Sequence, residues 1–239
     1  RRNALFGERL DVDMNNMNFD VAEDIVTEYK EESNYEGFKL EVIKNFSVDT
    51  EITEQEFNSK KIHDLTDKLF EEVTTFYIRK SEAVVNQAMP VLQQVFVDRG
   101  DVIEQIVVPF TDGIRHIQVP VELKKAIENN GKEITKSFEK TIVLALIDDS
   151  WKEHLREMDE LKQSVQNAVY EQKDPLIIYK MEAFNLFKNM LNVVNKEVVS
   201  FLFKGGIPMQ QEPEQVREAV APKPQPKLNA TKQEYGDQS

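Results

Sequence analysis

The residues of this sequence whose types could do chemistry gather in one short stretch. It carries Asp148, Asp149, Glu153, His154 and Glu157, and carboxylate and imidazole groups are ligands that proteins offer to transition metals. A di-metal site in a helical bundle needs a Glu-x-x-His pair on each of two helices. The helix expected to pack against this stretch contains no histidine. The pattern therefore favours a solvated acidic face with i,i+4 charge pairs, and a carboxylate metalloenzyme is the weakest of three functional hypotheses.

Other kinds of catalytic chemistry have no residues to support them in this sequence. There is no Gly-x-x-x-x-Gly-Lys-Ser/Thr loop to cradle a phosphate. There is no cysteine nucleophile, and no order of Ser, His and Asp suggests a catalytic triad. We expect His63 and His116 to belong to no catalytic motif with carboxylates. We therefore expect no catalytic residue, no cofactor-binding residue and no metal ligand in this chain.

Composition limits the partners that the chain can have. Its 239 residues are 40% hydrophobic and 31% charged, which is typical of a globular protein with a sizeable core. The net charge of −13 and pI near 4.8 would repel nucleic acid, so we expect no nucleic-acid partner. The absence of cysteine fits a reducing compartment. No apolar run is long enough to cross a bilayer, and the start at Arg1 without a methionine leads us to expect a fragment.

A helical hairpin, or finger, is the element that must position the acidic stretch. Apolar residues recur at steps of three and four on each of two consecutive segments, which places each set on one face of a helix. Asp174 is a good N-cap and Pro175 suits the first position of the second helix. The short connection between the segments requires antiparallel helices. The expected seams consist of Ile147, Trp151, His154, Met158, Leu161, Val165 and Ala168 on the first helix, and of Ile177, Phe184, Phe187, Leu191, Val194, Val198 and Phe201 on the second.

Four aromatic residues of the hairpin receive separate predictions. Trp151 is expected to lie in the hydrophobic core. The alternative is that its side chain anchors another part of the protein. Phe184 and Phe187 are core by spacing. Tyr170 lies at the polar tip, where it has no core of its own hairpin to enter; it either folds back on the helix ends or contacts a partner.

The rest of the sequence divides into three further regions. A helix ends near residue 11, a polar connection around Asn15 and Asn16 follows, and several short helices come next, with a kink or break at Pro90. Two β-branched runs around Asp112-Gly113 predict a β-hairpin near residues 105–120. The proline-rich end cannot bury a core and is expected to be a disordered linker. The expected fold is mostly α, with these regions: the end of a scaffold helix (1–14), a helical wing domain with the β-hairpin (15–133), the two-helix finger (134–205) and the linker (206–239).

Several ordered motifs resemble the two-helix finger of the SecA family, the ATP-driven motors of bacterial protein secretion. The opening run of residues 1–10 is similar to the end of the long scaffold helix of that family. The motifs of the finger are Asp149-Ser150-Trp151-Lys152-Glu153-His154-Leu155, Met158-Asp159-Glu160-Leu161, Tyr170-Glu171-Gln172-Lys173-Asp174-Pro175, Tyr179-Lys180 and Glu182-Ala183-Phe184.

The resemblance implies a function that the residues alone do not. It implies part of a motor that couples ATP hydrolysis to the passage of unfolded preproteins through the SecYEG channel. ATP and magnesium would bind in motor domains outside this chain. The implied partners are that channel, preproteins, the motor domains and an anionic membrane surface, and the implied location is the cytoplasm, peripherally on the inner face of the cell membrane. Tyr170, Gln172 and Lys173 at the finger tip are the implied contacts to channel and substrate. The alternative is a stand-alone acidic coiled-coil adaptor that binds a partner helix.

Overall fold

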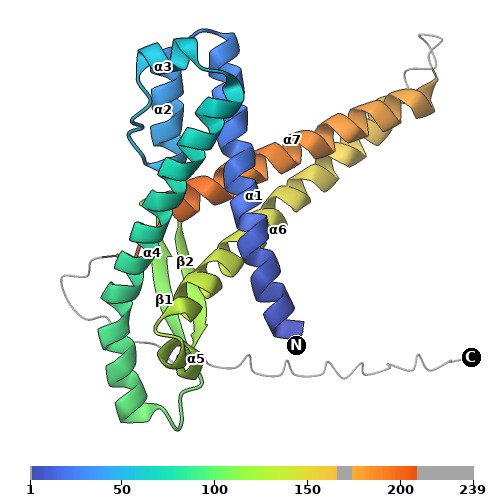
Figure 1. Ribbon diagram of the computed structural model, residues 1–239. Coiled ribbons are helices and arrows are strands. Elements are labelled where there is room, and N and C mark those ends of the chain that lie inside the picture. Colours follow the sequence, from blue (N-terminus) through green and yellow to red (C-terminus); the bar gives the residue numbers. More distant parts are fainter. Residues whose placement is uncertain (1, 166–173, 209–239) are drawn as a thin grey trace, which may run out of the picture.

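Long helices dominate the architecture, and one small sheet joins them (Figure 1). The computed structural model describes residues 2–165 and 174–208, with side chains from residue 14 onward. The elements in chain order are α1 (Arg2–Glu31), α2 (Tyr35–Phe46), α3 (Glu54–Ser59), α4 (Ile62–Arg99), β1 (Gln105–Thr111), β2 (His116–Glu122), α5 (Leu123–Glu128), α6 (Lys132–Ser164) and α7 (Pro175–Lys204). The mostly α fold with a small hairpin is confirmed.

Helix ends follow the capping chemistry of the sequence. Thr53 and Glu56 form a capping box at the start of α3, where each side chain accepts a hydrogen bond from the backbone N–H of the other residue. At the start of α7, Asp174 accepts a 2.8 Å hydrogen bond from the backbone N–H of Leu176, and Pro175 occupies the first turn. Local sequence therefore fixes where these helices begin.

Two predicted interruptions are wrong. Helix α1 runs unbroken through Asn15 and Asn16, because Met14 and Asn18 on either side of that pair are buried and packing overrides the weak helix propensity of asparagine. Helix α4, which has 38 residues in all, continues through Pro90, so of the kink or break expected there the break is absent.

The continuity of α4 at its proline has a similar cause. Ala88 and Leu92 flank Pro90 and are both buried in the core. Their packing holds the two parts of the helix together although the proline removes one backbone hydrogen bond. The wing is therefore built on a single long helix and not on two shorter ones.

The predicted β-hairpin is present, with β1 and β2 antiparallel. Its buried face presents Ile106, Val108 and Phe110 from β1, and Val119 and Val121 from β2. This face packs against the helices, and β2 lies along α5 and α6. A two-stranded hairpin is marginal by itself, so this contact with the helices keeps it folded.

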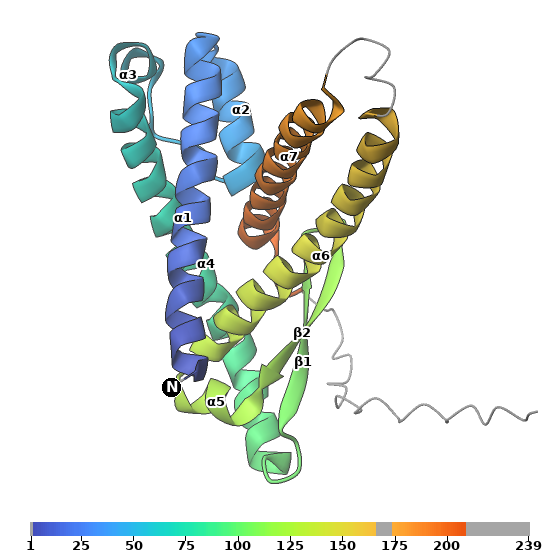
Figure 2. The same cartoon turned by 90° about the vertical axis from the view of Figure 1, so that its right-hand side faces the viewer.

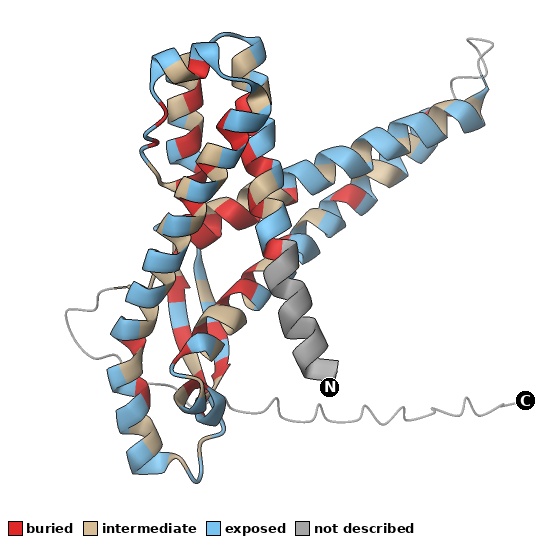
Figure 3. Ribbon diagram, in the orientation of Figure 1, coloured by how far each residue is buried: buried red, intermediate tan, exposed pale blue. Residues whose placement is uncertain are grey.

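The finger projects from the remainder of the molecule as the paired helices α6 and α7 (Figures 1 and 2). Its base belongs to the core, whereas its outer half is mostly exposed (Figure 3). The core itself lies where α1, α2 and α4 meet the end of α7, and where the hairpin meets the start of α6.

Candidate functional site

The finger is a pair of antiparallel helices whose contact surface is only partly the predicted one. Of the residues predicted for the first helix, His154 and Val165 are buried, whereas Ile147 is 42% exposed and its neighbour Leu146 is buried instead. On α7, Val194 and Val198 are buried, as predicted. The seam prediction is therefore correct toward the end of α7, and on the first helix it is correct at His154 and Val165.

Farther along the finger the seam prediction is wrong. Trp151 is 44% exposed and Phe184 is 66% exposed, so neither side chain is core. Phe187 and Leu191 are also exposed, whereas Leu186 and Met190, beside them in sequence, are partly buried. Each helix carries more apolar residues than one partner helix can cover, and spacing alone did not select the stripe that packs.

Exposed large apolar side chains are numerous on both helices of the finger. Single exposed apolar side chains are ordinary, but a contiguous apolar surface marks a place where another molecule or segment packs. The exposed members on α6 are Leu144, Ile147, Trp151 and Leu155, and those on α7 are Leu176, Ile177, Met181, Phe184, Phe187, Leu191 and Val193.

His154 lies between aromatic rings within the finger. Its imidazole centroid is 5.4 Å from the ring of Trp151 and 5.9 Å from that of Phe187. The side chain is buried, and Nδ1 has no hydrogen-bond partner among the described residues. The position predicted for His154 in the seam of the finger is therefore confirmed.

The acidic stretch of α6 forms charge pairs on the surface. Lys152 bonds Asp148 at 2.5 Å, and Arg156 bonds Glu153 at 2.8 Å. Within residues 2–165 and 174–208, no group of three or more His, Asp or Glu side chains is placed to hold a metal ion. Pairs of this kind on an exposed helix contribute little stability, so this stretch acts as a solvated face.

The predicted tip contacts lie outside the described residues. Tyr170, Gln172 and Lys173 fall between Val165, where the description of α6 ends, and Asp174. The structure describes the two helix ends that flank these residues.

A polar cluster at the base of the finger was missed by the sequence reasoning. Tyr77 of α4 donates a 2.9 Å hydrogen bond to Glu139 of α6, and Nζ of Lys80 donates to the carbonyl of Leu202 near the end of α7. Burial and the nearby Glu139 carboxylate raise the pKa of Tyr77 well above its ordinary value. Burial lowers the pKa of Lys80 to about 7.

Aromatic packing surrounds this polar cluster. Phe203 stacks on Phe76 with ring centroids 6.1 Å apart and meets Phe46 edge-on at 5.1 Å. Phe138 of α6 stacks on Phe110 of β1 at 4.1 Å. Such pairs favour offset and edge-on geometry, and together they fix the finger to α2, α4 and the hairpin. Tyr77 and Phe76 are adjacent on a predicted helix, but no short motif links them to α6 or α7.

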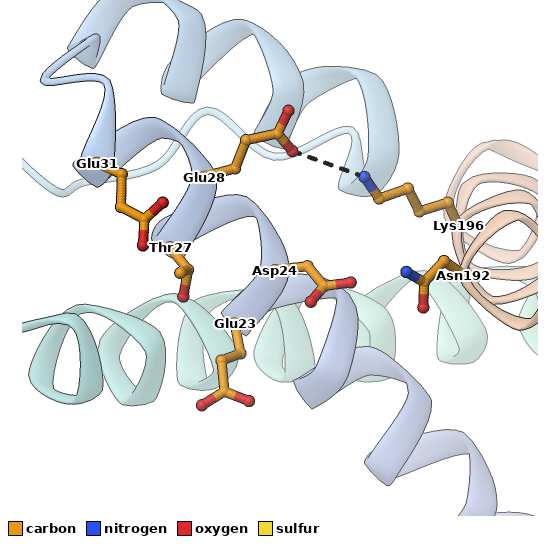
Figure 4. A pocket seen from close by; sticks show the side chains of 7 residues that line it. All are labelled: Glu23, Asp24, Thr27, Glu28, Glu31, Asn192 and Lys196. Carbon is orange, nitrogen blue, oxygen red and sulfur yellow. Dashed lines mark ion pairs between the residues drawn. The ribbon is translucent and has the colours of Figure 1, made fainter. Parts of the chain in front are cut away.

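An acidic groove of about 530 Å³ lies between α1 and α7 (Figure 4). Glu28 reaches across it to Lys196, with 3.9 Å between the charged atoms. Asp20 lies on α1 one turn before Asp24, and burial, followed by the charge of Asp24, raises its pKa. The groove is lined by Glu23, Asp24, Thr27, Glu28 and Glu31 of α1 and by Asn192 and Lys196 of α7.

None of the helices within the described part of the chain combines the length and the apolar character that crossing a membrane requires.

Comparison with known proteins identifies the kind of chain to which this architecture belongs. Residues 1–205 match the sequence model of the SecA wing and scaffold domain. The chain is 49% identical over 211 residues to a protein translocase subunit SecA of Flavobacterium psychrophilum, an alignment covering 88% of this chain and 19% of that protein. It is 47% identical over 234 residues to the SecA subunit of Christiangramia forsetii, covering 98% and 21% of the two chains. The SecA subunit of Phocaeicola vulgatus is also 47% identical, over 238 residues, covering 100% and 21%.

Proposed function

Because this chain belongs to the SecA family, we propose that it is the wing and finger part of a motor that drives preproteins through the SecYEG channel. The chain spans about a fifth of the length of the relatives that it matches. The activity of the whole protein, its substrates and its partners are therefore all part of this proposal. The finger supports this proposal most directly. Its sequence motifs, the bounds of its two helices and the match to the family all point to the same part of a SecA protein.

ATP and its magnesium ion belong to other parts of the protein in this proposal. The sequence has no phosphate-cradling loop, and the described residues offer no metal-binding cluster. The part of this chain is mechanical. A pair of packed helices can transmit a displacement along its length, because packed interfaces move as rigid bodies.

The exposed apolar stripe of the finger supports a partner within the same protein. Leu144, Trp151 and Phe184 would be covered by the motor domains, since an apolar stripe of this extent in a working protein needs a cover. Trp151 then acts as an anchor for the motor, which was the alternative to a core position.

The proposed location is the cytoplasm, with peripheral attachment to the inner face of the cell membrane. This chain carries a net charge of −13, and an anionic lipid surface repels negative charge. Contact with anionic lipid would therefore come from other parts of the protein, whereas this chain would approach the membrane through the channel.

At the tip, Tyr170 is the proposed contact to the moving preprotein, with Gln172 and Lys173 beside it. A tyrosine suits contact with unrelated sequences, because its ring offers apolar area and its hydroxyl can bond any backbone. The alternative of a stand-alone acidic adaptor has no counterpart among the relatives reported above, each of which is named as a translocase subunit.

Transport of a preprotein into membrane vesicles by the full-length protein tests this proposal. Tyr170→Ala is expected to reduce transport strongly, while ATP binding and the melting temperature stay near those of the parent. Tyr170→Phe is expected to retain most of the activity, since the ring is kept. Tyr179→Ala, which removes a half-buried ring on α7, is the matched control for a general loss of finger stability. Normal transport by Tyr170→Ala would contradict the tip contact.

A further inference from the structure

The chain that leaves the finger pairs with the hairpin. After α7 ends at Lys204, Gly206 forms an isolated antiparallel bridge with Thr111 of β1. Both hydrogen bonds of this bridge are 2.9 Å long, one from the N–H of Thr111 to the carbonyl of Gly206 and one in return. Gly206 therefore lies beside the edge of β1 that faces away from β2.

The bridge fixes which backbone groups of β1 point to that outer edge. In an antiparallel pair, alternate residues turn their N–H and C=O toward the partner strand and away from it. Since Thr111 turns its groups toward Gly206, the residues two, four and six positions earlier, Pro109, Val107 and Gln105, turn theirs outward as well. The hydrogen bond from Leu123 to Glu104 agrees with this alternation, because Glu104 belongs to the inward set.

The two prolines of the hairpin fit the same alternation. Pro109 lies opposite Gln118, and Pro120 lies opposite Val107. Both prolines occupy positions whose backbone faces away from the partner strand, where a missing N–H removes no bond from the hairpin ladder. Beyond Gly206, the described part of the chain provides no further strand for the outer edge of β1. The N–H and C=O of Val107 therefore face outward from a two-stranded sheet.

We propose that residues 207–212 continue from Gly206 along this edge and add a third strand to the hairpin. The bridge sets the register, with Pro208 opposite Pro109, Gln210 opposite Val107 and Glu212 opposite Gln105. The N–H and C=O of Gln210 then bond the outward groups of Val107. An edge strand with open backbone groups is a site for pairing with extended chain, and the segment that is already aligned antiparallel there is the favoured occupant.

Side-chain alternation supports the same register. Ile207 lies opposite Phe110, on the buried face of the hairpin, and it packs against the core. In the proposed register Met209 would be the next residue on that face, opposite Val108, and Gln210 and Glu212 would fall on the outer face. Apolar residues are thus placed inward and polar residues outward, and Pro213 ends the pattern. The third strand would hold the start of the proline-rich tail against the wing.

Cysteine cross-linking in the full-length protein tests the register. The chain has no cysteine, so pairs introduced into it are distinguishable from cysteines elsewhere by mass spectrometry of the linked peptides. Val107→Cys with Gln210→Cys is expected to form a disulfide on mild oxidation, since directly opposed strand residues have suitable Cα separations. Val107→Cys with Gln211→Cys is the matched control, because a shift of one residue turns the side chain to the other face. Equal yields from the two pairs, or none from the first, would overturn the proposal.

Amide exchange provides a second readout that needs no cysteine. The amide of Val107 is expected to exchange at least about tenfold faster in Gln210→Pro, which removes the N–H that faces β1, than in Gln211→Pro, whose missing N–H faces away. Equal rates in both variants would overturn the third strand.

A further cross-linking outcome concerns what occupies the edge of β1. If Val107→Cys links to an added unfolded secretory protein in preference to Gln210→Cys, the edge binds substrate and the proposal for the tail is wrong.

Discussion

The phenol of Tyr77 on α4 donates a 2.9 Å hydrogen bond to the carboxylate of Glu139 on α6, 62 residues later in the chain. Glu139 is only 7% exposed, so a buried acid links the wing to the base of the finger. Nζ of Lys80, one turn further along α4, donates to the carbonyl of Leu202 on α7. One face of α4 therefore contacts both helices of the finger at the base of the finger.

Removing the hydroxyl of Tyr77 should destabilise this root. Tyr77→Phe takes one donor from the buried carboxylate of Glu139, and a buried group that loses a partner costs about 1–3 kcal/mol. Urea unfolding of the parent and the variant measures the difference. Tyr179→Phe, at a half-buried position on α7, should change the free energy of unfolding by less than about 0.5 kcal/mol. A similarly small effect for Tyr77→Phe would mean that the bond contributes no net stability.

Lys80 predicts a gain in stability at alkaline pH. Burial lowers its pKa from 10.5 to about 7, so between these values the unfolded chain holds a proton that the folded chain has released. The contribution of this group to the free energy of unfolding therefore rises as pH increases from about 7 toward 10.5. Relative to the parent, Lys80→Met should lose this rise when urea unfolding is measured at pH 7 and pH 9. The exposed Lys124→Met should keep it, and a parallel response of both variants would contradict the prediction.

Two leucines on α7 should respond differently to truncation. Leu202 is fully buried, at 0% exposure, whereas Leu191 is 42% exposed. Leu202→Ala leaves a cavity and should cost about 2–5 kcal/mol. Leu191→Ala should cost less than about 1 kcal/mol, because a large part of the Leu191 side chain is already exposed to water in the folded protein. Equal losses in urea unfolding would mean that the spacing-based seam, and not the observed one, describes the finger in solution.

The capping box at α3 predicts a loss of stability in acid. Hydrogen bonds from Lys60, then from Lys68, then from the backbone of Thr53 lower the pKa of Glu56 from 4.5 to about 2. The contribution of the Glu56 carboxylate to the free energy of unfolding is therefore present above pH 4.5 and is lost as pH falls from 4.5 toward 2. Glu56→Gln should reduce this part of the acid dependence, measured as melting temperature between pH 5 and pH 3. Glu54→Gln, where no such set of bonds exists among the described residues, is the control that should behave like the parent.

Local features of the fold were predictable because their causes lie within a few residues. The capping pair Thr53 and Glu56, the start of α7 at Asp174 and the hairpin around Asp112-Gly113 all follow from short-range chemistry. The exposed Phe184 and Trp151 were mispredicted for the opposite reason. Helical spacing identifies apolar stripes, but which stripe packs inside this chain depends on the partners that are available to it.

The base of the finger was not predictable from local sequence. Tyr77 and Glu139, or Lys80 and Leu202, meet only after several helices have taken their places. The unbroken course of α1 is another case, since burial of Met14 and Asn18 outweighs two asparagines whose intrinsic preference is for turns. The proposed tip residue Tyr170 rests on the resemblance alone and stays a prediction.

The continuity of α1 makes it a lever. At about 1.5 Å per residue its 30 residues extend about 45 Å, and it contacts α2, α4 and α7 along the way. With its start held and no flexible joint at the asparagines, a tilt of about 10° would sweep its other end through about 8 Å, by the same helix length. A torque applied at the start of α1 would therefore reach the small helices α2 and α3 as a rigid-body rotation of the whole helix. Any motion of α1 relative to its neighbours would have to come from sliding at the contacts between them.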